Sequence, residues 1–538
     1  MSLAFDEYGR PFLIIKEQDA KTRLSGIEAL KSHISAARAV ADVMKTSLGP
    51  TGMDKILVSP DGNITITNDG ATILKDMHVE HEIARLLVEL SQSQDHEIGD
   101  GTTSVVVLAG ALLEEAEALL DKGIHPLKIS DGYEMACKAV IKNLGKLSVS
   151  SRDDTNVSLR EKLIKAASTS LNSKVISKYR RQFAELAVDS VLKIHDKGKN
   201  TVDLDMIKVT GKVGKDLEDS VLIDGLLIDK EFSHAQMPKL VENAKIAILN
   251  CPFEPPRPKT KHKLDIISGG DLKQLKEYEV SIFQSMIDNL KKADVSLVIC
   301  QWGFDDEANY LLLKNELPAV RWVMGGDIEL VAKATRGNII SRFEDIEKSK
   351  LGSAKFVKEI SLGTSKEHYI TIEGCSDERI VTVLLYAGND MILEEAKRSF
   401  HDAVCVVKNL VLNESIVPGG GATEISGSTM LMNEATTLGS LQSLSFNAFS
   451  RALLKIPECL ISNSGNNSLE IIPAIKSMQL TTANSSIGFN CLSSNICDMI
   501  GENVVEPLNS KKHIISLATQ LVRMILKIDD VIHCKQSS

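Results

Sequence analysis

The chain of 538 residues is too long for one hydrophobic core, and its 43% hydrophobic and 25% charged residues are typical of folded domains, so we expect about two to four domains. Its net charge of −10 argues against a surface built for nucleic acid, and we expect no nucleic-acid partner. No apolar run reaches the ~18 residues of a membrane span, and the N-terminus lacks the basic start and apolar run of a signal peptide. We therefore expect a soluble cytoplasmic protein with no membrane partner.

The nine cysteines are scattered along the chain and form no Cys-x-x-Cys pair. An odd number with this spacing suggests neither a disulfide framework nor a zinc site. We expect reduced and mostly buried thiols.

The first 150 residues are predicted to be mainly helical. Apolar residues recur at helical spacing over 26–48, which predicts a long helix ended by Gly49-Pro50. Two short strands, 55–58 and 63–67, flank the turn Ser59-Pro60-Asp61-Gly62 and predict a hairpin. Helical spacing returns in three later stretches, residues 71–90, 104–120 and 127–147.

The composition changes in the middle of the chain. Residues 148–211 are more polar and mixed, whereas 219–363 alternate short apolar runs with helical stretches, which predicts an α/β domain. After about residue 370 the chain is predicted to become helical again, with a final amphipathic run at 514–531. Within the α/β domain the strands are expected at 244–249, 295–300 and 319–323, and the helices at 272–292 and 306–315.

A proline-rich segment at 252–263 is predicted to be an exposed excursion, because four prolines preclude regular structure and a basic run at 259–263 follows them. The basic run has no interleaved aromatic residues, which disfavours nucleic-acid binding. The helix predicted at 272–292 carries an apolar stripe. This stripe packs within its own domain or contacts a partner transiently, and the pattern leaves both interpretations open.

The sharpest chemical motif is Gly99-Asp100-Gly101-Thr102-Thr103-Ser104, placed directly before an apolar helix. Free amides at a helix start attract phosphate, and the Asp100 carboxylate suits a hard cation such as magnesium. The plainer interpretation is an ordinary threonine or serine helix cap.

A second glycine loop, Leu48-Gly49-Pro50-Thr51-Gly52, would let backbone approach a nucleotide or would merely stop a helix, which is the commoner use of Gly-Pro. Farther along, Asp69 ends a predicted strand, Asp402 lies on a helical stretch, and Gly419-Gly420-Gly421 opens another helix. No spacing rule joins these pieces, and a lone aspartate is more often a cap or a surface charge. The common phosphate-loop and dinucleotide-binding motifs are both missing from the sequence.

The order of these motifs along the chain resembles the group II chaperonins. The resemblance rests on residues 47–52, 67–72 and 99–104, on His401-Asp402-Ala403, and on the glycine triplet at 419–421, and it spans essentially the whole chain. Four further segments, 4–11, 253–256, 259–263 and 300–306, resemble the eukaryotic cytosolic members of that family.

This resemblance implies a multidomain chaperonin fold with α and α/β parts. A mainly helical equatorial domain would comprise residues 1–147 and 404–538, and a small α/β intermediate domain would comprise 148–218 and 370–403. An α/β apical domain would occupy 219–369, with a helical protrusion near 252–292 that serves as a built-in lid.

The resemblance also implies a site for ATP or ADP with Mg²⁺, and K⁺ as a further cation. Asp402 and Asp69 would be catalytic, acting on the attacking water, and Asp100 would bind the metal. Lys174, with Ser173 beside it, matches a loop that senses the γ-phosphate. The nucleotide-binding set would be Leu48, Gly49, Pro50, Gly101, Thr102, Thr103, Ser104, Ser173, Lys174, Gly420, Gly421, Cys491, Glu506 and Lys511.

The implied function is ATP-dependent protein folding. The chain would join paralogous subunits in a hetero-oligomeric double ring, hydrolyse ATP, and close a lid over unfolded client proteins. The alternative is a ring subunit that binds nucleotide but hydrolyses it weakly. Two departures from the family pattern, Tyr386-Ala387-Gly388 and Asn490, bear on coupling and nucleotide affinity.

Overall fold

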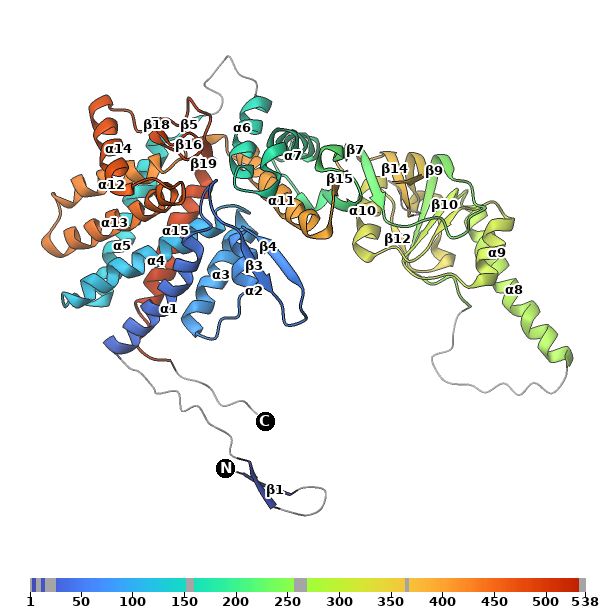
Figure 1. Cartoon of the computed structure of the whole chain (residues 1–538). Helices are drawn as coiled ribbons and strands as arrows, with labels where there is room; N and C mark the ends of the chain where they lie inside the picture. The colour runs from blue at the N-terminus through green and yellow to red at the C-terminus, as the bar shows by residue number, and fades with distance from the viewer. Residues whose placement is uncertain are drawn as a thin grey trace.

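The computed structural model describes residues 2–5, 11–14, 26–150, 159–255, 269–362 and 367–531. Most of its helices and strands gather in three bodies arranged one after another (Figure 1). Both ends of the chain build the first body, which is blue and orange to red in Figure 1. The middle of the chain forms the farthest body, and two short segments form the connecting body between them.

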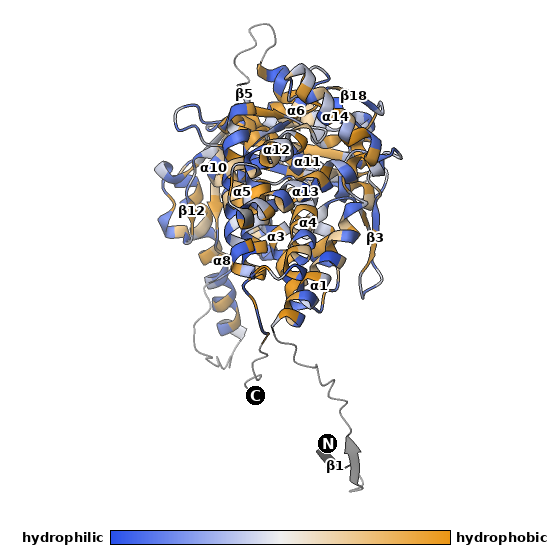
Figure 2. Cartoon of the chain, turned by 90° about the vertical axis from the view of Figure 1, so that its left-hand side faces the viewer, coloured by the Kyte–Doolittle hydropathy of each residue, from blue (hydrophilic) through white to orange (hydrophobic). Residues whose placement is uncertain are grey.

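The first body is mainly helical, and Figure 2 shows hydrophobic and hydrophilic residues alternating along its helices, as amphipathic packing requires. A separate antiparallel hairpin, β1 (Ser2–Phe5) with β2 (Pro11–Ile14), precedes it. The N-terminal half contributes α1 (Ile27–Lys45), β3 (Lys55–Val58), β4 (Ile64–Thr67), α2 (Gly70–Asp76), α3 (Glu82–Glu97), α4 (Thr102–Asp121), α5 (Pro126–Leu147) and β5 (Val149–Ser150). The C-terminal half contributes β16 (Ser415–Pro418), α12 (Ala422–Ala435), α13 (Ser440–Asn463), α14 (Ser468–Thr482), β17 (Ile487–Asn490), β18 (Asn495–Asp498), β19 (Val505–Pro507) and α15 (Leu508–Ile525).

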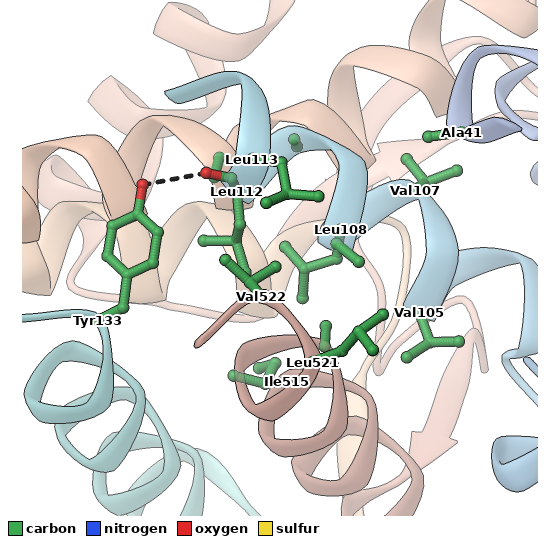
Figure 3. Packing of buried hydrophobic residues seen from close by; sticks show 14 of the residues in the cluster. Ala41, Val105, Val107, Leu108, Leu112, Leu113, Tyr133, Ile515, Leu521 and Val522 are labelled. Atoms are coloured by element: carbon green, nitrogen blue, oxygen red, sulfur yellow. Dashed lines mark hydrogen bonds between the residues drawn. The ribbon is translucent and has the colours of Figure 1, made fainter. Parts of the chain in front are cut away.

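Helix α4 is the centre of this body. Its residues from Val105 to Leu113 are all buried, and the helix packs against α1, α3, α13 and α15. Figure 3 shows part of this packing, with Ala41 of α1 and Ile515, Leu521 and Val522 of α15 near the α4 side chains. Gly110 permits the close approach to α1, because a Cβ there would lie 2.3 Å from the Cβ of Ala41. The phenol of Tyr133 on α5 donates a hydrogen bond of 3.1 Å to the carbonyl of Leu112. A helical stretch that is apolar on all sides, as Val105–Leu113 is, belongs in a core, and this one joins the two halves of the chain.

The connecting body combines helices with a three-stranded sheet in the order β6-β15-β7, where β6 and β15 are parallel. The long helix α11 packs against α6 and α7 and shares their hydrophobic core. The elements of the connecting body are α6 (Leu159–Leu171), α7 (Arg180–Ile194), β6 (Ile207–Val213), β7 (Val221–Ile223), β15 (Val381–Ala387) and α11 (Asp390–Leu412).

The farthest body is an α/β domain around a seven-stranded sheet in the order β11-β10-β9-β13-β14-β8, with β12 also paired to β9. Helix α8 projects from it (Figure 1). The elements are β8 (Gly225–Ile228), β9 (Leu240–Leu249), α8 (Gly269–Lys292), β10 (Leu297–Cys300), α9 (Asp306–Lys314), β11 (Ala319–Val320), α10 (Gly325–Thr335), β12 (Ile339–Ile340), β13 (Gly352–Ser361) and β14 (His368–Cys375).

The apical domain implied by the sequence has its limits at residues 219 and 369. Strand β7 lies inside these limits but pairs with β15 in the small sheet. Strand β14 extends beyond residue 369 but pairs within the large sheet. The buried residues of α8 are Phe283, Ile287 and Leu290, all in its C-terminal half, and Phe283 and Leu290 belong to the predicted apolar stripe. These three belong to the core of their own domain. Leu272, at the other end of the stripe, is exposed.

Two predictions of secondary structure were wrong. The helix expected over 71–90 is two helices, because His81 caps a new one by accepting a hydrogen bond from the amide of Ile83 at 3.2 Å. The chain after residue 370 does not turn helical at once, since β14 and β15 come before α11. Both strands are rich in β-branched and aromatic residues, which favour pleated structure. The basic run at 259–263 and Cys534 lie outside the described residues.

Within the described ranges, no helix combines the length and apolarity needed to cross a lipid bilayer.

The α4 core generates a prediction about stability. Tyr133→Phe should lower the free energy of unfolding by about 1 kcal/mol, because one buried hydrogen bond is lost, whereas Leu108→Ala should cost ~2–5 kcal/mol through the cavity it leaves. Denaturant unfolding of both variants measures the difference. Equal losses would contradict the central place given to α4.

Candidate active site

One cavity gathers residues from both halves of the helical body and from the connecting body. It is lined by the loop after α1, the start of α2, the start of α4, the loop after α6, one face of α11, and the segments around β17 and β19. Of the site residues expected from the sequence, those lining it are Leu48, Gly49, Pro50, Asp69, Asp100, Gly101, Thr102, Thr103, Ser104, Ser173, Lys174, Asp402, Gly420, Cys491, Glu506 and Lys511. Gly421 does not line the cavity and is instead the N-cap of α12.

The N-terminus of α4 opens at this cavity without a side-chain cap. Its N-cap is Gly101, at a φ of 77°, so the plainer interpretation of a threonine or serine cap is wrong. Glycine is needed, since a Cβ at this position would lie 2.6 Å from Cδ1 of Ile514. Helix α12 also starts at an uncapped glycine, Gly421, next to the cavity-lining Gly420. Free amides and the helix dipole make such starts attractive to anions.

Asp100 stands between two glycines with positive φ, Gly99 and Gly101. Its Oδ1 accepts a hydrogen bond of 2.8 Å from the amide of Gly101, and burial raises the pKa of its carboxyl. A bound cation would relieve this buried charge. The described residues contain no cluster of three or more His, Cys, Asp or Glu that could hold a metal. Mg²⁺ fits this donor set, because it commonly takes one or two carboxylates and completes its shell with phosphate oxygens and water.

Asp69 is the N-cap of α2, which is the common role of a lone aspartate named in the sequence analysis. Its carboxylate also lines the cavity. Oδ2 accepts hydrogen bonds from the amide and the hydroxyl of Thr72, at 3.0 and 2.7 Å, and Oδ1 accepts one of 3.4 Å from the hydroxyl of Thr102. Burial opposes its ionisation, but Lys174 and the Thr72 hydrogen bonds lower the pKa of Asp69 overall. The carboxylate is therefore held ionised and fixed.

Asp402 on α11 forms an ion pair with Lys174 from the loop after α6, at 2.7 Å between Oδ2 and Nζ. Their side chains are only 12% and 9% exposed. Burial raises the pKa of Asp402 to about 8 despite the nearby ammonium. Burial also disfavours the charged lysine, yet Asp402 and Asp69 raise the pKa of Lys174, which stays protonated.

A second buried lysine, Lys511, bonds to two carboxylates, Glu424 at 2.6 Å and Glu506 at 2.9 Å. Burial disfavours its charge, but the two glutamates raise the pKa of Lys511 overall. Burial raises the pKa of Glu506, whereas for Glu424 the attraction of Lys511 outweighs burial and lowers the pKa. Cys491 is a neutral thiol here, because burial raises its pKa to about 11.

Sequence reasoning missed several residues of the site. Glu424 follows the glycine triplet by three positions, but no charge pattern links it to Lys511. Phe489 and Ser510 line the cavity without any motif to mark them. Asn68 also lines it and donates a hydrogen bond of 3.2 Å from Nδ2 to the carbonyl of Ser173. In the sequence, only its position directly before Asp69 indicated that Asn68 could belong to the site.

The Lys511 cluster yields a prediction. Lys511→Met should destabilise the protein by about 3–5 kcal/mol, because two buried carboxylates lose their counter-charge. Denaturant unfolding measures the loss, and Lys512→Met, at the less buried neighbouring position, is the matched control and should change little. Similar effects of the two substitutions would contradict the role given to the buried lysine.

Comparisons with known proteins agree with this arrangement. The model of the TCP-1/cpn60 chaperonin family matches residues 40–536. T-complex protein 1 subunit epsilon of Encephalitozoon cuniculi is 47% identical over 533 residues, covering 98% of each chain. Thermosome subunit alpha of Saccharolobus shibatae and thermosome subunit beta of Aeropyrum pernix are each 39% identical, over 97% of this chain and 94% of theirs.

Proposed function

Because the chain belongs to the TCP-1/cpn60 chaperonin family and is an ATP-dependent protein-folding chaperonin with ATPase activity, we propose that the cavity described above is where it binds and hydrolyses ATP. The observation that carries the proposal is the meeting of an uncapped helix start, the glycine-flanked carboxylate of Asp100 and the Asp402–Lys174 pair in one cavity. This is the set that phosphate binding, cation binding and water activation require.

In this proposal the ligand's phosphates lie against the start of α4, at Gly101, Thr102, Thr103 and Ser104. Asp100 holds Mg²⁺, which when bound would offset the charge of the phosphates. Lys174 and Ser173 face the terminal phosphate. The rest of the nucleotide lies against other residues that line the same cavity: Leu48, Gly49, Pro50, Gly420, Cys491, Glu506 and Lys511. Gly421 does not line the cavity and contributes as the N-cap of α12.

Asp402 is the proposed general base. Lys174 holds its Oδ2, which leaves the other oxygen to accept a proton from water. A base works best when its pKa is close to the working pH, and about 8 meets that condition. Asp69, fixed by Thr72 and Thr102, orients the water.

We assign the three bodies to the domains implied by the sequence. The helical body corresponds to the equatorial domain (1–147 with 404–538), although α11 extends into this range. The connecting body corresponds to the intermediate domain (148–218 with 370–403) together with β7. The farthest body corresponds to the apical domain (219–369), without β7 but with all of β14, and α8 belongs to its lid protrusion. The Asp402–Lys174 pair comes from the connecting body and the phosphate loops from the helical body. Loss of the γ-phosphate would therefore change a contact between two domains and shift the balance between open and closed forms.

The chain is further proposed to work in the cytosol as an epsilon-type subunit of a hetero-oligomeric double ring that receives unfolded client proteins. Its identity to a T-complex protein 1 epsilon subunit, 47%, exceeds that to the two thermosome subunits, 39% each. K⁺ would be a further cation. The presence of both Asp69 and Asp402 in the cavity favours full hydrolysis over the weakly hydrolysing alternative.

The proposed roles of the two aspartates can be separated. Asp402→Asn should lower ATP turnover by about 10²–10⁴-fold, because the base is lost, while nucleotide binding changes little. Asp100→Asn should weaken Mg²⁺-dependent nucleotide binding by about tenfold or more. Turnover and nucleotide affinity are measured in rings where this chain supplies the only hydrolysing site.

Asp95→Asn is the matched control, since Asp95 lies near Asp69 but does not line the cavity. It should retain both binding and turnover. Normal turnover in Asp402→Asn, or equal loss of binding in both cavity variants, would overturn the assignment.

The raised pKa of Asp402 predicts that the rate of ATP hydrolysis depends on pH. A general base acts in its ionised form, whose fraction grows as the pH rises through about 8, so kcat/KM should increase between about pH 7 and about pH 9. Initial-rate measurements across this range test it. Asp402→Asn should remove the increase, and a falling profile in the unaltered protein would contradict the role of Asp402.

A further inference from the structure

The loop at residues 98–101 joins α3 to α4 and carries Asp100 between two glycines. Glycine restricts its backbone less than any other residue, so hydrogen bonds must fix the direction of this loop. One residue of α3, Gln94, makes three of them. Its side chain is fully buried and does not line the cavity, so Gln94 acts on the loop and not on the ligand space.

Gln94 bonds to the loop through both its backbone and its side chain. Its backbone carbonyl accepts hydrogen bonds from the amides of Ile98 and Gly99, at 3.0 and 3.2 Å. Any residue at the end of a helix can make bonds of this kind. Its side-chain Nε2 donates to the backbone carbonyl of Asp100 at 2.8 Å, and this bond requires a long side chain with a donor.

The peptide unit between Asp100 and Gly101 links this bond to the carboxylate. Its carbonyl accepts from Gln94, and its amide donates to Oδ1 of Asp100 at 2.8 Å. The two groups lie in one rigid plane, so a bond that fixes the carbonyl also fixes the amide that holds the carboxylate. Gly101 offers little resistance to rotation of this plane. The bond from Gln94 is therefore what opposes the rotation.

Gln94 is itself oriented by His513 of α15. Nδ1 of His513 and Oε1 of Gln94 are 2.8 Å apart. Because Nε2 of Gln94 faces a carbonyl, Oε1 is the acceptor in this pair, and His513 carries a hydrogen on Nδ1. An amide turned the other way would place two oxygens against each other. The side chain of Gln94 thus has one favourable orientation, and it connects α3, the loop and α15.

Resting on the proposed ATPase site, we propose that Gln94 is a positioning residue for Mg²⁺, which directs the Asp100 carboxylate toward the cation without touching the cation or the nucleotide. His513 supports it by fixing the orientation of its amide. Mg²⁺ demands near-ideal octahedral geometry, so a carboxylate that is free to swing binds it less well than one held in place. Loss of a residue that holds a metal ligand typically lowers metal affinity by about 10–100-fold.

The test measures how the binding of a fluorescent ADP analogue depends on Mg²⁺ concentration, in assembled rings where this chain supplies the only intact nucleotide site. Gln94→Met keeps the length of the side chain and removes both of its hydrogen bonds. It should raise the Mg²⁺ concentration at half-maximal binding by about tenfold and leave Mg²⁺-independent binding unchanged. Gln94→Asn, whose amide is one methylene too short to reach the Asp100 carbonyl, should shift the requirement in the same direction.

Gln479→Met is the matched control. Gln479 is also buried, and its Nε2 likewise donates to backbone carbonyls, those of Ala422 and Ile487, at 3.2 and 2.7 Å. It does not line the cavity. This variant should lose thermal stability as Gln94→Met does, yet keep the Mg²⁺ requirement of the parent. Equal shifts of that requirement in the two variants would mean general loosening and would overturn the inference.

Gln94→Met combined with Asp100→Asn tests whether Gln94 acts through Asp100. The double variant should need at most about twice the Mg²⁺ of Asp100→Asn, because the carboxylate to be positioned is already gone. Shifts that multiply would overturn the inference, and so would a parental requirement in Gln94→Met beside a shifted one in Asp100→Asn. If Asp100→Asn itself left the Mg²⁺ requirement unchanged, the proposed function would fail instead.

Discussion

The burial of helix α4 is the constraint on which the site depends. The helix is enclosed by α1, α3, α13 and α15, so its first turn cannot shift without disturbing the largest core of the protein. That turn has a glycine at its cap and no side-chain cap, and the amide of Gly101 itself donates to Asp100 Oδ1. Packing energy, supplied mainly by aliphatic residues, thus holds a set of polar groups in a fixed direction. Preorganisation of this kind is what an enzyme needs where charge develops in a reaction.

In the proposed function, the charges of the cavity explain why cations would accompany the nucleotide. Asp69, Asp100, Asp402 and Glu506 line it, and the lysines that line it, Lys174 and Lys511, are both already paired with carboxylates. A polyphosphate entering this space meets more negative than positive side chains. Binding must therefore rely on the amides at the start of α4 and on metal ions that bring positive charge with the ligand.

The family and its multidomain chaperonin fold could be predicted from the sequence, because ordered motifs far apart in the chain are specific as a set. The glycine-flanked Asp100 and the hairpin around Ser59-Pro60-Asp61-Gly62 follow from local rules, and local rules are readable in sequence. Strand β15 was missed since its pairing partners, β6 and β7, lie far away in sequence, whereas β14 has one distant partner, β8, and one that directly precedes it, β13. The same reason hid Glu424, whose link to Lys511 spans 87 positions and exists only after folding. The hydrogen bond from Asn68 to the carbonyl of Ser173 likewise joins residues that are 105 positions apart.

The division of the helical body between the two chain ends has a consequence for biosynthesis. Helices α1 to α5 emerge from the ribosome first, but α13 and α15, which cover α4, begin more than 300 residues after α4 ends. Until then the most apolar helix of the protein lacks half of its cover, while the connecting and farthest bodies have most of their own residues and can fold as units. Contacts of such long sequence separation form slowly. A chain of this design is itself at risk of aggregation during synthesis. It exposes apolar surface before its fold is complete, which is the same hazard from which chaperones protect other proteins.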